Sequence, residues 1–290
     1  MTASIVLGGS GYIGSNLLAQ LSTDGVETVQ VSRRRVPGVG NICVDLASAD
    51  VEEFGDLFSL RPTTAYILGR PTSTDFEEAN RYHYNVKRLV SHWARSGHLR
   101  SVVFTSTSLV YPDSTDEVGA TSLGTVPRAT NLYEYSKLDF EAYLQFLATA
   151  VHPDIAFAAY RIPIVFGGTY QAEGNTPQHL YWMIQQYLNG RTWKFDTAAE
   201  LSFGTSWLHL PDFVRELSRP SRKPGFELRN CASGYFKFAD LHEILSRLFP
   251  AALIEHMPVN KCDMRIKDEC GMQMLDIEQV IRDQDLGHAQ

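Results

Sequence analysis

The stretch Gly8-Gly-Ser-Gly-Tyr-Ile-Gly14 lies between an apolar run at residues 4–7 and a helical pattern at residues 12–21. Its glycines permit a tight turn from strand to helix, let the backbone approach a phosphate and let the helix pack closely on the strand. A dinucleotide pyrophosphate can be held at such a helix N-terminus. Glycine clusters also mark plain turns, but the strand before this cluster and the amphipathic helix after it favour a nucleotide site.

The first half of the chain alternates short apolar or β-branched runs with helical patterns, which is typical of a parallel sheet wound with helices. The first helical pattern, for example, places Ile13, Leu17 and Leu21 on one face. We therefore predict a doubly wound, parallel α/β fold. The predicted strands are residues 4–7, 28–31, 42–44, 65–68, 101–105 and 155–160, and the predicted helices are residues 12–21, 84–94 and 138–150.

After Gly167-Gly168 the sequence becomes more polar and loop-rich, with further helices predicted at residues 180–188, 212–218 and 238–249. We interpret residues 1–167 as the main domain, to which residues 205–230 return. Residues 168–204 and 231–290 form a predicted smaller lobe. This lobe is expected to fold over the C-terminal edge of the sheet, where open α/β sheets bind ligands, and is therefore the predicted substrate-binding lobe.

The composition argues against some classes of partner. With 290 residues, 44% of them apolar and 20% charged, the chain is an ordinary globular protein that can bury a large core. Its net charge of −7 argues against a nucleic-acid or anionic-membrane partner, which would need a basic surface. A small anionic molecule is not excluded, because a few local arginines can hold one phosphate.

The four cysteines, Cys43, Cys231, Cys262 and Cys270, form no C-x-x-C pair. We expect them to be reduced, as in a cytosolic protein, with no metal-binding or catalytic role. No charged leader precedes the first apolar run, and no window approaches the length of a membrane span. The predicted localisation is cytoplasmic.

The end of the second predicted strand, Ser32-Arg-Arg-Arg35, indicates which nucleotide would bind. An NAD site usually offers a carboxylate there to the ribose hydroxyls. Here Ser32 can donate to a 2′-phosphate and Arg33 or Arg34 can pair with it, which favours NADP. The alternative is a solvated basic loop without a ligand. Asp45, just after the third predicted strand, can contact an adenine amine or can be a turn residue.

Tyr133-Glu-Tyr-Ser-Lys137 places a phenol and an ammonium four residues apart, on one face of a helix. A free tyrosine has a pKa of about 10 and is a poor acid–base catalyst at neutral pH, but Lys137 and a cationic nicotinamide ring would lower that pKa. Thr107 lies in a run of hydroxyls at the end of the fifth predicted strand and can polarise a substrate carbonyl. Tyr-x-x-x-Lys also occurs by chance in helices. Its combination with the upstream glycine turn favours redox chemistry on a carbonyl or an alcohol.

Together these residues resemble the extended short-chain dehydrogenase/reductase superfamily, the group that contains nucleotide-sugar epimerases, dehydratases and ketoreductases. The resemblance covers about the first 170 residues well and the remainder loosely. It implies a Rossmann-type fold and a nicotinamide cofactor. The matching residues are Gly8, Gly11 and Gly14, Asp45-Leu46, residues 65–69, Asn85-Val86, residues 105–111, Tyr133 and Lys137, residues 161–167, and His209 with Asp212.

The resemblance also implies roles for individual residues. Tyr133 would be the acid–base, and Lys137 would bind the nicotinamide ribose and tune Tyr133. Thr107 would hold the substrate oxygen, with Ser106 as the fallback. Cofactor contacts are expected from Gly8, Gly11, Tyr12, Ile13, Ser32, Arg33, Arg34, Asp45, Leu46, Gly69, Lys137 and Pro163, and substrate contacts from Thr107, Ser108, Asn175, His179 and Arg265.

Three departures from the family pattern bear on the substrate. Ser108-Leu109 stands where sugar dehydratases follow their active-site Thr with Asp-Glu, so a 4,6-dehydratase is not expected. The arginines after the second strand fit the exchangeable NADP of a net reductase better than the retained NAD of an epimerase. Thr205 stands where the family often carries an arginine that clamps the substrate diphosphate.

The resulting prediction is an NADP-dependent oxidoreductase that reduces a keto group, most simply on a nucleotide-linked 4-keto-6-deoxy sugar. An epimerase with retained NAD and an NADPH-dependent reductase of a non-sugar carbonyl are the alternatives. An NADP-binding sensor without turnover is disfavoured by the Tyr133 and Lys137 pair. Family members often dimerise through the helices predicted at residues 84–94 and 138–150, so a homodimer is expected.

Overall fold

A computed structural model describes residues 4–33, 40–47, 54–70, 75–112, 122–169, 179–189, 191–192, 203–221, 223–249, 253–254 and 265–284. The chain divides into two compact units. The first comprises Met1–Val110, Ala129–Arg161 and Val214–Arg229, and the second comprises Tyr111–Arg128, Ile162–Phe213 and Asn230–Gln290. These boundaries differ from the predicted ones. The second unit already includes Tyr111–Arg128, and the segment that returns to the first unit starts at Val214 rather than at residue 205.

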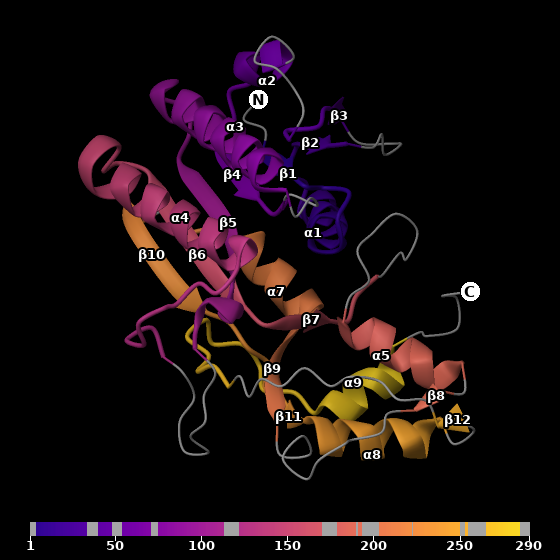
Figure 1. Cartoon of the computed structure of the whole chain (residues 1–290). Helices are drawn as coiled ribbons and strands as arrows, with labels where there is room; N and C mark the ends of the chain where they lie inside the picture. Colours follow the sequence, from indigo (N-terminus) through magenta and orange to yellow (C-terminus); the bar gives the residue numbers. More distant parts are fainter. Residues whose placement is uncertain are drawn as a thin grey trace. The chain divides into compact units, whose positions relative to one another are not determined.

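Among the described residues, the first unit is built on a seven-stranded sheet in the order β10-β6-β5-β4-β1-β2-β3 (Figure 1). β1 pairs in parallel with both β2 and β4, and β4 pairs in parallel with β5. The strand order therefore reverses between β1 and β4, which confirms the predicted doubly wound fold and puts its ligand-binding switch point at the carboxyl ends of these two strands. The strands are β1 Ser4–Leu7, β2 Thr28–Ser32, β3 Gly40–Cys43, β4 Thr64–Ile67, β5 Ser101–Thr107, β6 Ala156–Ile162 and β10 Gly225–Asn230.

Helices cover both faces of this sheet (Figure 1). Helix α1 (Tyr12–Thr23) packs on β1 and β2. Helices α3 (Phe76–Arg95) and α4 (Leu132–Phe146) lie side by side on the opposite face. The two are joined by an ion pair in which Lys87 Nζ lies 2.5 Å from Asp139 Oδ2. The short helix α2 is Gly55–Ser59, and α4 continues as a π-helical turn at Leu147–Val151.

Both long helices begin earlier than the apolar spacing predicted, because polar caps start them. Asp75 Oδ1 accepts a hydrogen bond from Glu78 N (2.9 Å), so α3 begins eight residues before the predicted start at residue 84. At α4, Asn131 Oδ1 accepts from Glu134 N (3.0 Å), and Glu134 Oε1 accepts from Asn131 Nδ2 (2.7 Å). This reciprocal cap puts Tyr133 and Lys137 in the first two turns of α4.

The core of the first unit fills the space between the sheet and the layer of α3 and α4. The rings of Phe104 on β5 and Phe140 on α4 pack with their centroids 4.6 Å apart. Trp93 on α3 is fully buried, and its Nε1 donates to Leu57 O (3.0 Å). This packing fixes α4 against β5, and therefore fixes the side chains that α4 directs at the end of β5.

The second unit contains a small sheet in the order β11-β9-β7. β7 (Ile164–Phe166) runs parallel to β9 (Gly204–His209), and β11 (Gly234–Lys237) runs antiparallel to it. Of the helices predicted beyond residue 168, all three are present, as α5 His179–Leu188, α7 Leu210–Leu217 and α8 Phe238–Leu248. The other elements in the described part of this unit are β8 Arg191–Thr192, β12 Leu253–Ile254 and α9 Ile277–Asp283. None of the helices described is both long and apolar enough to cross a membrane.

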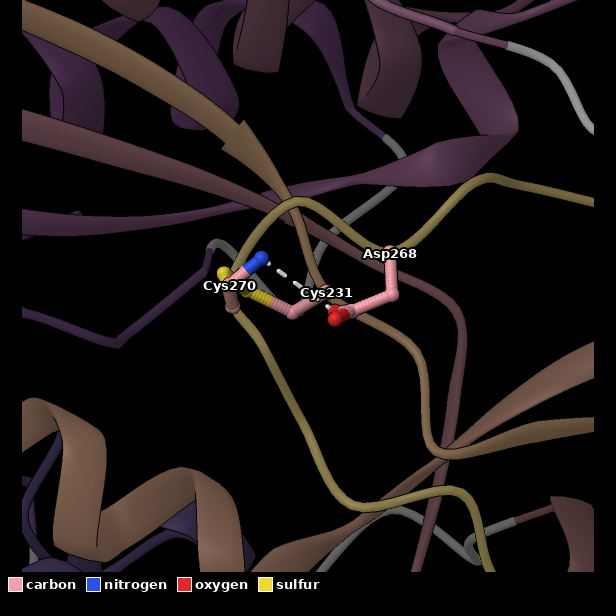
Figure 2. A group of neighbouring side chains, drawn as sticks. All are labelled: Cys231, Asp268 and Cys270. Carbon is pink, nitrogen blue, oxygen red and sulfur yellow. Dashed lines mark hydrogen bonds between the residues drawn. A yellow bond between two sulfur atoms is a disulfide. The ribbon is translucent and has the colours of Figure 1, made fainter.

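The prediction that the cysteines are reduced is wrong for two of them. Cys231 and Cys270 form a disulfide, and their Cα atoms lie 5.3 Å apart (Figure 2). Asp268 organises the surrounding loop, because its Oδ1 accepts hydrogen bonds from the backbone N of Ala232 (3.1 Å) and of Cys270 (3.3 Å). The two cysteines are separated by 39 residues, so the pairing could not be predicted from their spacing. Since disulfides are typical of oxidising compartments, the cysteines no longer support the cytoplasmic prediction.

The pairing predicts a labelling pattern. Without reductant, iodoacetamide should alkylate Cys43, whose thiol is exposed, and should leave Cys231 and Cys270 unmodified. A peptide map under the same conditions should contain one cross-linked fragment that carries both residues, and reduction before alkylation should abolish it. Alkylation of Cys231 in the unreduced, folded protein would contradict the disulfide. Cys262 lies outside the described residues and is not part of this test.

Candidate active site

The glycine turn has the backbone geometry that its sequence predicts. Gly8 has a φ of +86°, a conformation that favours glycine, and a Cβ built on it would lie 2.6 Å from Gly69 N at the end of β4. A Cβ on Gly14 would lie 2.2 Å from Gly8 O. Gly11 precedes α1 and has no side chain to cap it, so an anion can take that position at the helix N-terminus, just before Tyr12 and Ile13. The turn at the switch point is therefore packed too closely on itself and on the end of β4 to accept a residue larger than glycine at positions 8 and 14.

Three of the predicted adenosine contacts, Ser32, Arg33 and Asp45, lie at or just after the ends of β2 and β3. Ser32 is buried and its Oγ accepts a hydrogen bond from Gln30 Nε2 (3.0 Å), whereas Arg33 is exposed. Asp45 Oδ1 accepts from Ala47 N (3.0 Å), which makes Asp45 a turn residue in this structure. Arg34 lies outside the described residues.

Two side chains from α3 support this end of the site. Asn85 Nδ2 donates to Leu46 O (2.9 Å) and so ties the loop after β3 to α3. Tyr82, which the sequence analysis missed, packs so closely on Gly69 that a Cβ there would lie 2.4 Å from its hydroxyl. Burial raises the pKa of the Tyr82 phenol, with an opposing effect of the Arg33 charge and a smaller, reinforcing effect of Asp45. Tyr82 occupies an ordinary core position of a helix, so its sequence spacing carries no signal of this placement.

The residues predicted to transfer a proton come together at the end of β5 and the start of α4. The Thr107 hydroxyl is close enough to the Tyr133 phenol to lower its pKa. Lys137 is almost fully buried, its Nζ donates to Thr105 O (2.7 Å), and it lies 5.6 Å from the centroid of the Tyr133 ring. The structure thus brings together the phenol, hydroxyl and ammonium that the sequence analysis singled out.

The electrostatics of this group differ from the expectation. Burial raises the pKa of Tyr133 above its usual value, although the Thr107 hydroxyl and the charge of Arg70 oppose the rise. The expected lowering by the Lys137 ammonium is not seen, because burial and the nearby Arg70 charge lower the pKa of Lys137 to about 7, against the opposing effect of Glu141. The cation that acts on the phenol is therefore Arg70.

Arg70 is a second residue that the sequence analysis missed. It is exposed, directly follows Gly69 at the carboxyl end of β4, and its guanidinium carbon lies 5.6 Å from the centroid of the Tyr133 ring. A basic residue at the C-terminal edge of the sheet was the available signal, since that edge is where the fold binds ligands.

The serines around Thr107 have other partners or positions. Ser106 Oγ donates to Glu141 Oε1 (2.5 Å), and Glu141 also pairs with Arg161, whose Nη2 lies 2.7 Å from Glu141 Oε2. Ser106 is therefore engaged by this buried pair, and Thr107 is the hydroxyl that meets Tyr133. Ser108 is buried in the 3₁₀ turn Ser108–Val110 that follows β5.

The other predicted contacts belong to the second unit. Arg265 is exposed, and its guanidinium carbon lies 4.9 Å from the centroid of the Tyr235 ring. Pro163 lies between β6 and β7, and His179 is the first residue of α5. Asn175 lies outside the described residues. Thr205 is buried on β9, and His209 Nδ1 lies 2.8 Å from Asp212 Oδ2.

Comparison with known proteins agrees with this architecture. The family model described as the NAD dependent epimerase/dehydratase family matches residues 4–224. The solved structure of MoeE5 in complex with UDP-glucuronic acid and NAD has a TM-score of 0.75 and 23% identity, with 97% of each chain covered. UDP-glucose 4-epimerase from Thermotoga maritima, solved with UDP-glucose, has a TM-score of 0.79 and 17% identity, covering 97% of this chain and 96% of its own. A GalE-like L-threonine dehydrogenase from Cupriavidus necator has a TM-score of 0.72 and 18% identity, with 92% of each chain covered. At these identities the likeness concerns the fold.

Proposed function

The chain belongs to the NAD dependent epimerase/dehydratase family, and from that membership we propose that it is an NADP-dependent oxidoreductase that reduces a keto group on a nucleotide-linked sugar. The observation that carries the proposal is the placement of Thr107 and the buried Lys137 beside Tyr133. These residues and the glycine turn belong to the same compact unit. A 4-keto-6-deoxy sugar is the first substrate class to test.

The residues present fit a dinucleotide and a proton transfer. The turn at the switch point is packed too closely for a Cβ at Gly8 or Gly14, and it presents the N-terminus of α1 without a side-chain cap, where a phosphate can bind. The family uses nicotinamide cofactors, and a bound NADPH supplies a hydride for the carbonyl carbon. Thr107 would hold the carbonyl oxygen while the Tyr133 hydroxyl gives it a proton. Because burial raises the pKa of Tyr133, the phenol is protonated at neutral pH, which is the state that a reduction requires.

The proposal is tested by titrating the cofactor-stripped protein with NADPH and NADH, followed by turnover with keto-sugar nucleotides. We expect preferential, exchangeable NADPH binding and NADPH consumption with a 4-keto sugar nucleotide. Binding of neither cofactor would contradict the assignment of the glycine turn. Release of NAD from the untreated protein on denaturation would instead favour an epimerase.

Two alternatives are each supported by a specific observation. MoeE5 in complex with NAD and the UDP-glucose 4-epimerase share this fold, which supports an epimerase with retained NAD. The L-threonine dehydrogenase also shares it, and Thr205 replaces the expected diphosphate-clamping arginine, which supports a non-sugar substrate. We propose a homodimer as well, since α3 and α4 expose Tyr84 (60%), Tyr135 (55%) and Phe146 (57%).

The cofactor preference gives a quantitative prediction. Replacing Arg33 and Arg34 together by alanine should raise the Kd of NADPH by about 10- to 100-fold, because each charge-assisted hydrogen bond to a 2′-phosphate contributes roughly 1.5–3 kcal/mol. The Kd of NADH, which lacks that phosphate, should be unchanged. Fluorescence titration measures both values, and Arg95→Ala at the exposed end of α3 is the control. An unchanged Kd of NADPH in the double variant would contradict the NADP preference.

A further inference from the structure

The guanidinium of Arg70 lies over the ring of Tyr133, the proposed acid–base residue. Arg70 is not among the residues that match the family pattern. Its guanidinium carbon and Lys137 Nζ are each 5.6 Å from the centroid of the Tyr133 ring. Arg70 follows β4 at the switch point, so its backbone is fixed by the sheet and by the contact of Gly69 with Gly8. Its side chain is exposed. A ligand that meets the Tyr133 hydroxyl would therefore come within reach of a flexible guanidinium.

The charges around this group are not balanced. Two carboxylates influence these residues: Glu134 acts on the pKa of Tyr133, and Glu141 acts on the pKa of Lys137. Both carboxylates bind other residues. Glu134 accepts from Thr130 N, Thr130 Oγ1 and Asn131 Nδ2 at 2.6–2.8 Å. Glu141 accepts from Ser106 and from Arg161.

Arg70 has neither an ion pair nor a hydrogen bond with any residue in the described ranges, and its charge and that of Lys137 repel each other. The Arg70 cation, with the partly protonated Lys137 on the same neutral phenol, makes a site whose electrostatic energy falls when an anion binds. An arginine presents its N–H groups as a planar fork that suits a carboxylate or a phosphate.

We propose that Arg70 is an oxyanion-binding residue for the substrate, holding a carboxylate or phosphate of the substrate beside the Tyr133 hydroxyl. This inference rests on the proposed function for the identity of the substrate and deepens it by requiring an anionic group near the reacting carbon. The carboxylate of an acidic sugar and the diphosphate of a nucleotide sugar share this chemistry. The cofactor pyrophosphate is served by the glycine turn, so Arg70 is assigned to the substrate.

The test is a calorimetric titration of the NADPH-saturated protein with UDP-glucuronic acid and with UDP-glucose, neither of which has to turn over. In Arg70→Gln we expect the Kd to rise by about 10- to 100-fold for the ligand whose oxyanion it holds. If the Kd rises for UDP-glucuronic acid alone, Arg70 binds the sugar carboxylate. If it rises equally for both ligands, Arg70 binds the diphosphate. Arg70→Lys keeps the charge without the fork and should fall between the wild type and Arg70→Gln. Arg88→Gln is the matched control, because Arg88 lies at the same 5.6 Å from the ring of Tyr84 on α3.

An unchanged Kd for both sugar nucleotides in Arg70→Gln would overturn the proposal, as would a rise confined to NADPH. If the wild type binds neither sugar nucleotide, the nucleotide-sugar assignment fails, and the subsite is tested without it. Phenylglyoxal should modify the exposed Arg70, and malonate or inorganic phosphate should slow that modification but not that of Arg88. Equal protection of both arginines, or of neither, would then overturn the oxyanion site.

Discussion

Replacing Tyr133 by phenylalanine should lower the turnover of a keto substrate by about 10²- to 10⁴-fold, the usual contribution of a positioned general acid. In the proposed mechanism the phenol gives a proton to a substrate oxygen held by Thr107, and phenylalanine removes only the hydroxyl that carries this proton. The aromatic ring that Arg70 and Lys137 face is kept, so the packing around it should be preserved. The measurement is kcat with saturating NADPH and substrate.

The control for Tyr133→Phe is Tyr135→Phe, two residues further along α4. Tyr135 is 55% exposed and points away from the face that carries Tyr133 and Lys137, so its hydroxyl should be dispensable. The Kd of NADPH should be the same in both variants and in the wild type, because neither hydroxyl is needed by the glycine turn. A Tyr133→Phe variant with at least half of the wild-type kcat would exclude the phenol as the proton donor.

The parts of the site that could be predicted from the sequence are those whose geometry is determined by residues close together in the chain. The positive φ of Gly8 and the close approach of Gly14 to Gly8 O both follow from one short segment. The helical spacing of Tyr133 and Lys137 likewise needs only one turn of α4. In each case the residues that determine the geometry are neighbours in the chain, so the pattern can be recognised without knowing the fold.

The parts that the sequence did not predict depend on contacts between distant segments. Arg70 meets Tyr133 only because β4 ends, and α4 begins, at the same edge of the sheet. Cys231 and Cys270 meet because a loop returns to the end of β10. The early starts of α3 and α4 were missed for another reason, since Asp75 and Asn131 are polar caps that the apolar spacing ignores.

The strands of the second unit show a further limit of periodicity. β9 is Gly-Thr-Ser-Trp-Leu-His and is buried over its first five residues, including Thr205 and Ser206. A strand with small polar residues in its buried positions has no alternation of apolar and polar side chains. Its hydroxyls find partners only in the fold, as when Ser206 Oγ accepts a hydrogen bond from Ile266 N (3.0 Å).

Replacing Glu141 by alanine should lower the free energy of unfolding by about 3–5 kcal/mol, the usual cost of removing one partner of a buried ion pair. Glu141 and Arg161 are 6% and 3% exposed, and Arg161 binds both carboxylate oxygens, with Nε at 3.0 Å and Nη2 at 2.7 Å. The variant leaves the buried guanidinium without its carboxylate and Ser106 Oγ without its acceptor. Urea-induced unfolding at neutral pH measures the loss.

Two comparisons separate the ion pair from a general effect of substitution on α4. The double variant Glu141→Leu with Arg161→Met removes both charges and should cost far less than Glu141→Ala, because apolar residues can fill the same space. Asp139→Ala breaks the ion pair between Asp139 and Lys87, whose side chains are 40% and 25% exposed respectively. This variant should lower the free energy of unfolding by less than about 1 kcal/mol. Because Glu141 opposes the lowering of the Lys137 pKa, Glu141→Ala should lower that pKa further and neutralise the ammonium at neutral pH. If Glu141→Ala were no more destabilising than Asp139→Ala, the buried pair would not be what holds α4 against β5 and β6.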